Sequence, residues 1–228
     1  MSSADPARSD RFIDLSHTVK DGLVTYPGLP APAMCDYLSR EESRERYVDG
    51  VEFQIGRIDM VSNTGTYIDS PFHRYEGRKD LSQLDLERIA DVEAVVVRAR
   101  GADRAIDAGA LAALGIDLAG KAVLVDTGFS QYFGTPRYFE GHPFLTEAAA
   151  RFLVDARVAL VGIDSLNIDD VADLRRPVHS LVLGADIPIV EHMTGLDRLP
   201  DTGARFFAVP VKIRGFGTFP VRAFAIAG

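Results

Sequence analysis

Apolar residues in the middle of the chain form short uninterrupted runs, and segments with helical spacing separate these runs. The runs cover residues 92–97, 121–126 and 158–164. Each is rich in β-branched side chains, which predicts a buried strand. Asp107 precedes a short apolar stretch over 108–114, and Thr146 precedes apolar positions that recur at helical spacing up to Ala156. Asp and Thr are good N-caps, so both segments predict helices. Strands that alternate with helices predict an α/β fold.

The two ends of the chain have a different pattern. Residues 206–213 and 219–226 are apolar runs separated by a short Gly-containing segment, which predicts a β-hairpin. Residues 51–60 alternate moderately between apolar and polar side chains, which predicts a strand. We expect that strand to deliver the loop of residues 63–73 at its end, because strands commonly carry active-site loops in this way.

Composition limits the classes of protein that remain. The chain has 228 residues, 46% of them hydrophobic, which fits one compact domain with a sizeable core. Its formal net charge of −8 argues against nucleic-acid and anionic-membrane partners. Cys35 is the single cysteine, so an intrachain disulfide and a cysteine-based zinc site are both excluded.

The first residues of the chain do not resemble a secretory signal, and no segment predicts a membrane span. Residues 1–11 are mostly polar and predict a flexible tail, and residues 12–228 are expected to form the folded domain. No run approaches the roughly 20 apolar residues that a membrane span requires. We therefore expect a cytoplasmic protein that does not interact with membranes.

Two pairs of residues carry candidate chemistry. Asp69 and His73 lie four residues apart in a segment rich in turn formers, and His179 is followed by Glu191 after an apolar stretch. A carboxylate near an imidazole can bind a metal or share a proton, but such spacing more often marks a simple hydrogen-bonded pair. Glu191 follows a strongly apolar strand-like segment, where a carboxylate needs a cation, a metal or hydrogen-bond donors.

Residues 63–73 closely resemble the H-x-G-T-H-x-D-x-P-x-H signature of the cyclase family, which includes bacterial kynurenine formamidase and isatin hydrolase. Asn63 and Tyr67 stand where that signature has histidines. Further matching segments extend the resemblance over nearly all of residues 12–228. They are residues 13–17, 26–28, 126–128, 142–143, 162–165, 179–191 and 219–223.

The resemblance implies a fold and an activity. The fold would be a single α/β domain of the swivelling β/β/α-like type, with mixed central β-structure flanked by helices, and members usually assemble as homodimers or homotetramers. The activity would be hydrolysis of a small-molecule substrate, namely an amide, formamide, lactam or lactone.

The resemblance also assigns roles to individual residues. Asp69, His179 and Glu191 correspond to ligands of one metal, whereas the other metal position of the family loses both of its imidazoles. Carboxylate and imidazole ligands suit one divalent ion, with zinc and manganese as the first candidates. His73 matches the catalytic histidine and would act as general acid and base. We expect the last two site residues, Tyr26 and Asn63, to contact substrate.

Two alternatives remain open at this point. The chain could be a metal-free hydrolase, cyclase or lyase of the same fold, with His73 and Tyr67 as its catalytic residues. It could also be a non-catalytic protein that binds a small molecule. Asn and Tyr both offer hydrogen-bonding groups, so either alternative keeps a polar pocket.

Overall fold

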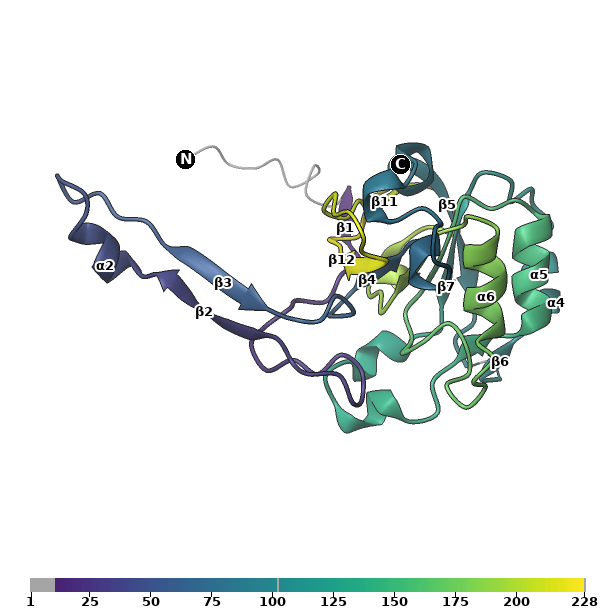
Figure 1. The fold of residues 1–228 in the computed structure, drawn as a ribbon. Helices are drawn as coiled ribbons and strands as arrows, with labels where there is room; N and C mark the ends of the chain where they lie inside the picture. The colour runs from purple at the N-terminus through teal and green to yellow at the C-terminus, as the bar shows by residue number, and fades with distance from the viewer. Residues whose placement is uncertain (1–10, 102, 228) are drawn as a thin grey trace.

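A curled sheet of nine strands forms the centre of the molecule (Figure 1), seen in a computed structural model that describes residues 11–101 and 103–227. In order across the sheet the strands are β1 (Phe12–Asp14), β13 (Phe224–Ile226), β11 (Thr202–Phe207), β5 (Val92–Arg98), β7 (Ala122–Asp126), β9 (Leu160–Ile163), β10 (Ile189–Glu191), β4 (Tyr67–Asp69) and β12 (Thr218–Pro220). The neighbours β5, β7, β9 and β10 are parallel, and the outer strands pair antiparallel. The predicted α/β fold with mixed β-structure is confirmed. All but the last residue of the predicted N-terminal tail lies outside the described residues.

Three helices cover one face of this sheet (Figure 1). They are α4 (Ala108–Ala112), α5 (Glu147–Asp155) and α6 (Pro177–Gly184). The expected cap of α5 is present, because Thr146 Oγ1 accepts a hydrogen bond from the Ala149 amide at 3.2 Å. The remaining short elements are α3 (Leu86–Ile89), β6 (Ala105–Ile106), β8 (Phe144–Leu145) and the 3-10 turns η1 (Pro71–His73), η2 (Leu81–Gln83), η3 (Phe129–Tyr132), η4 (Pro136–Phe139) and η5 (Leu196–Arg198). None of the helices in the described ranges has both the length and the apolar character needed to cross a membrane.

The central strands are buried on both faces, which explains their uninterrupted apolar runs. In β5, Ala94 and Val96 pack inside the curl of the sheet, whereas Val95 and Val97 pack under the helices. The inner cluster also contains Ile13 of β1 and Ile68 of β4, which lie near opposite ends of the strand order. The sheet therefore curls around its own core.

The predicted C-terminal hairpin is only partly correct. β13 does pair with β11, with Phe206 opposite Ala225. The second apolar run, however, is divided, and its first part is β12, which pairs with β4 near the other end of the sheet. Residues 208–213 form no strand, in line with Pro210, which has no amide to donate to a ladder.

A long arm projects from the body of the molecule (Figure 1). It contains β2 (Ala33–Leu38), the short helix α2 (Arg40–Arg44) and β3 (Ile55–Asp59), and the two strands pair only with each other. The strand predicted within residues 51–60 is therefore present as β3. It lies outside the central sheet, and all five of its residues are exposed.

Candidate active site

A cavity of about 470 Å³ lies beside β4 and the start of α6. Five of the seven predicted site residues line it, namely Tyr26, Asn63, Tyr67, His73 and His179. The other two, Asp69 and Glu191, are buried and lie next to His179. Side chains that are far apart in the sequence thus meet at one place.

Antiparallel pairing of β4 with β10 positions the acidic residues. Tyr67 lies opposite Glu191, and Asp69 lies opposite Ile189. Alternate residues of a strand share a face, so Tyr67, Asp69 and Glu191 all project from the helix-covered side of the sheet. The Tyr67 hydroxyl donates a hydrogen bond to Glu191 Oε2 at 2.7 Å.

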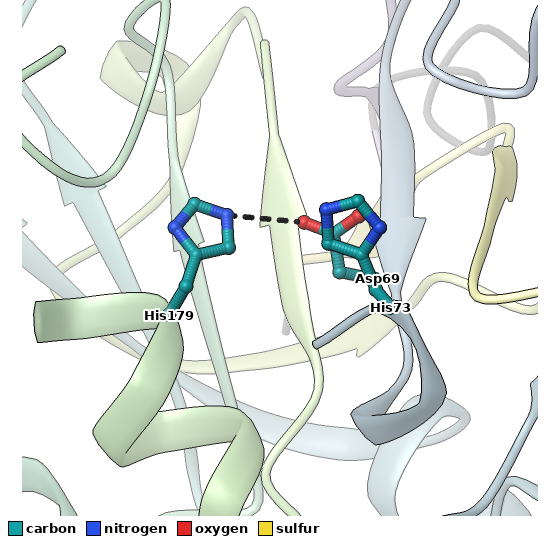
Figure 2. A group of neighbouring side chains, drawn as sticks. All are labelled: Asp69, His73 and His179. Atoms are coloured by element: carbon teal, nitrogen blue, oxygen red, sulfur yellow. Dashed lines mark ion pairs between the residues drawn. The ribbon is translucent and has the colours of Figure 1, made fainter. Parts of the chain in front are cut away.

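His179 reaches the same place from the first turn of α6 (Figure 2). Its Nε2 atom lies 3.6 Å from Asp69 Oδ2 and 3.8 Å from Glu191 Oε1. His73 follows β4 on η1, and one ligand atom each from Asp69, His73 and His179 fall within 4.8 Å of one another. Separations of this size leave room for one ion at ordinary ligand distances of about 2.0–2.2 Å.

Asp169 fixes the orientation of His179. Its carboxylate accepts hydrogen bonds from His179 Nδ1 at 2.6 Å and from the backbone amides of Val178 and His179. The Nδ1 hydrogen bond leaves Nε2 directed at Asp69 and Glu191. A carboxylate behind an imidazole is the usual arrangement around a metal-binding histidine.

Asp69 provides the strongest indication that this site can hold a cation. The residue is fully buried, and within the described part of the chain neither of its carboxylate oxygens has a hydrogen-bond partner. A buried carboxylate without partners is costly, and a positive charge beside it would offset that cost. Either a metal ion or a protonated His179 can supply that charge.

Burial and neighbouring charges shift the pKa values of the side chains next to Asp69. Burial lowers the pKa of His179, but the hydrogen bond to Asp169 and the nearby carboxylates of Asp69 and Glu191 outweigh that effect and raise it. Burial and the Asp69 charge raise the pKa of Glu191. A divalent ion would release the His179 proton, because imidazole binds a metal in its neutral form. Among the described residues, the ligand atoms that gather closely enough for one divalent ion are those of Asp69, His73 and His179, whereas Glu191 lies beside His179 and is not part of this group.

Tyr67 and Asn63 are held by hydrogen bonds in the positions where the family signature has histidines. Burial, followed by the charges of Glu191 and Asp69, raises the pKa of Tyr67 well above its usual value, so the phenol stays neutral. Asn63 Oδ1 accepts a hydrogen bond from the Thr218 hydroxyl at 3.0 Å. Neither side chain is prepared to act as a strong metal ligand.

The sequence did not reveal four further residues near the cavity. They are Arg74, Asn167, Asp169 and Arg176. Asp169 precedes His179 by ten residues and caps α6 from a separate turn, so helical or strand spacing gives no signal for it. Pro177 stands at the first position of α6, where proline is favoured, but Arg176 before it provides no side-chain cap, so the usual N-cap signal is absent.

Comparison with known proteins identifies the family of this chain. A model of the family described as putative cyclase matches residues 13–170, which is more than half of the chain. This chain belongs to the cyclase family. The family predicted from residues 63–73 is therefore confirmed.

Several cyclase-family relatives match nearly the whole chain. Kynurenine formamidase of Bacillus cytotoxicus is 28% identical, over 95% of this chain and 97% of that protein. Kynurenine formamidase of Erythrobacter litoralis is 29% identical, over 89% of this chain and 88% of that protein.

Solved structures of the family share the fold. A structure described as a potential metal-dependent hydrolase with cyclase activity superposes with a TM-score of 0.78 at 26% identity, covering 95% of this chain and 98% of that one. Isatin hydrolase A from Labrenzia aggregata superposes with a TM-score of 0.83 at 23% identity, covering 97% and 96% of the two chains. The second likeness concerns the fold alone.

Proposed function

We propose that this cyclase-family chain hydrolyses an amide C–N bond in a small molecule, with one divalent ion bound by Asp69, His179 and Glu191. The observation that carries the proposal is the buried Asp69 carboxylate, which lacks hydrogen-bond partners among the described residues and faces His179 Nε2. The names of the relatives, kynurenine formamidase and isatin hydrolase, point to formamides and lactams as the first substrates to test. Lactones are the corresponding esters.

Each site residue has a defined task in this proposal. When bound, zinc or manganese would polarise the scissile carbonyl and lower the pKa of water towards about 7. His73, whose ring borders the cavity, takes a proton from the attacking water and returns it to the nitrogen as the C–N bond breaks. Asp169 keeps His179 in the required tautomer, and Tyr67 holds Glu191.

Tyr26 and Asn63 are proposed to contact the substrate. Both line the cavity and are partly buried, so a bound molecule can reach them. The aromatic ring of Tyr26 can stack on a planar substrate, and the Asn63 amide can donate to a carbonyl oxygen.

A metal-free enzyme is the second candidate, because one observation favours it. The raised pKa of His179 means that this side chain can itself carry the positive charge beside Asp69 when no ion is bound. His73 would then act as general acid and base with no metal, as one of the sequence-based alternatives supposes, while the neutral Tyr67 hydroxyl could only donate a proton.

Hydrolysis before and after metal removal tests the two candidates. Formanilide and isatin serve as a formamide and a lactam, with protein purified without added ions, then chelated, then supplied with Zn²⁺ or Mn²⁺. We expect activity to disappear on chelation and to return with one of the ions, and Asp69→Ala to be inactive throughout. Asp91→Ala, an exposed aspartate paired with Arg205, is the control. Activity that survives complete chelation would favour the metal-free enzyme, and ligand binding without turnover would favour a binding protein.

We also propose that the chain assembles as a homodimer or homotetramer through its arm. The arm exposes large apolar side chains, including Tyr37, Val48, Phe53 and Ile58. An isolated two-stranded sheet is only marginally stable in water, so this one needs a covering surface. A second copy of the chain is the occupant proposed here.

A further inference from the structure

The walls of the active-site cavity contain two arginines and no acidic side chain. Arg74 and Arg176 are among the lining residues, and none of the others is an aspartate or glutamate. The protein as a whole carries a formal net charge of −8, so the charge of the cavity wall is opposite in sign to that of the whole chain. Such a wall favours an anionic molecule in the cavity.

Neither arginine is neutralised by a neighbouring carboxylate. Among the described residues, no ion pair shorter than 4.0 Å includes Arg74 or Arg176, whereas the adjacent Arg175 pairs with Asp173 at 2.7 Å. Arg74 instead donates through Nε to the Ser180 hydroxyl at 3.2 Å. Their positive charges therefore remain available to a ligand.

Arg176 is held in place without being saturated. Its guanidinium donates to Asn167 Oδ1 at 3.3 Å, to the Asp170 carbonyl at 3.4 Å and to the Tyr26 hydroxyl at 3.4 Å. All three acceptors are uncharged, and these bonds are longer than the usual 2.9–3.0 Å. A guanidinium has five N–H donors, so at least one edge is left for a planar anion.

The backbone at Arg176 also limits where its side chain can lie. The residue is the N-cap of α6 with φ 50°, a conformation that glycine or asparagine adopts more readily. Pro177 follows it and begins the helix that carries His179. The start of α6 therefore positions both the partly buried Arg176 and the candidate metal ligand His179. Both residues line the cavity.

We propose that Arg176, assisted by Arg74, binds a carboxylate of the substrate, at a distance from the amide bond that is cleaved. The substrate class is accordingly a small amide that carries a separate ionised carboxylate. This inference deepens the proposed function and rests on it for the reaction, but carboxylate binding by Arg176 can be measured without turnover.

Binding of matched aromatic ligands tests the proposal. The probes are the three aminobenzoate isomers and the corresponding neutral aminobenzamides, titrated by calorimetry into the protein as purified and again after chelation. A charge-assisted, two-point contact predicts a preference for at least one carboxylate of about 10- to 100-fold over its amide. The chelated sample contains no metal that could bind the carboxylate. A preference for the carboxylate measured in that sample therefore arises from the protein's side chains.

Four variants connect the preference for the carboxylate to individual arginine side chains. We expect Arg176→Gln to abolish it with little change for the neutral amides, Arg176→Lys to retain part of it, and the control Arg175→Gln to leave it intact. Arg74→Gln should reduce it less than Arg176→Gln. Thermal unfolding checks each variant, and Arg176→Lys and Arg74→Gln keep the test decisive if Arg176→Gln does not fold.

Two results would overturn the inference. One is a wild-type protein that binds every carboxylate no better than its amide, and the other is an Arg176→Gln variant that weakens both ligand types equally. Neither result bears on the proposed hydrolysis, which fails separately if chelation leaves turnover of formanilide and isatin unchanged or if neither is hydrolysed.

Discussion

Asn63 and Tyr67 are the residues that most distinguish this chain from the family signature. In place of two imidazoles, the cavity has a carboxamide that accepts from Thr218 and a neutral phenol that donates to Glu191. Hydrogen bonds therefore satisfy the two side chains that replace the histidine ligands of one metal position in the family signature. At the other metal position, no hydrogen bond from the described residues satisfies the buried carboxylate of Asp69. We therefore expect this site to bind one ion.

Restoring the histidines should change the stoichiometry of metal binding. We expect the double variant Asn63→His, Tyr67→His to bind about two ions per chain where the wild type binds about one, because imidazole is a far better zinc ligand than an amide or a neutral phenol. Zinc titration monitored by calorimetry measures the difference. The control Asn167→His adds an imidazole elsewhere on the cavity and should not add a site. An unchanged stoichiometry in the double variant would contradict this assignment of the two positions.

At the scale of elements, very short strands and turns set the geometry of the site. β4 and β10 have three residues each, and their register alone places Glu191 against Tyr67. η1 then holds His73, and Gly217 packs closely against its backbone. A Cβ atom at Gly217 would lie 2.5 Å from His73 Cα, far inside van der Waals contact.

Gly217→Ala should therefore displace His73. We expect loss of activity of about tenfold or more, since small shifts of a catalytic group are costly, and a destabilisation of about 1–3 kcal/mol from overpacking. Gly109→Ala is the matched control, because its added Cβ meets no atom within 4 Å on helix α4. That change should raise the free energy of unfolding by up to about 1 kcal/mol. Full activity in Gly217→Ala would show that the position of His73 does not matter for turnover.

The sequence predicted those elements whose patterns are local. β5, β7, β9 and α5 follow from apolar runs and an N-cap, and the signature in residues 63–73 identified the family. α6 was missed because its N-terminal amides are capped by Asp169 from a distant turn. The division of the C-terminal run between two ends of the sheet was also missed, since strand partners depend on tertiary packing.

The site could be predicted only as far as the signature extends. Local spacing indicated Asp69 and His73, and family resemblance added His179 and Glu191. The sequence alone did not indicate Asp169 or Arg176. Their roles depend on contacts with His179 and with the cavity, and these contacts form only in the folded chain. Assignment of the metal and catalytic roles stays a prediction, as does the cytoplasmic location.

In the molecule as a whole, the arm is the element whose apolar side chains are least covered by the rest of the chain. Its strands pair only with each other, and Val48 and Tyr37 are 76% and 74% exposed. Burying such side chains against a second copy would contribute roughly 25 cal/mol per Å² of apolar surface. An assembly of two or four chains would thereby stabilise an element that is weak alone.

Charged substitutions on the arm should separate the copies. We expect the wild type to be dimeric or tetrameric by light scattering after size-exclusion chromatography, and Tyr37→Lys, Ile58→Lys to be monomeric yet folded. Leu86→Lys, at an exposed leucine on α3, is the control and should keep the wild-type mass. A monomeric wild type, or an arm variant with unchanged mass, would refute assembly through the arm.

The metal content of the protein distinguishes a single-metal site from a metal-free one. Elemental analysis of wild type and Asp69→Ala, both purified without chelators or added ions, should give about one divalent ion per wild-type chain and almost none in the variant, because removing a buried carboxylate ligand removes the charge that retains the ion. A wild-type protein without a stoichiometric metal, or an Asp69→Ala variant that retains it, would contradict the single-metal account.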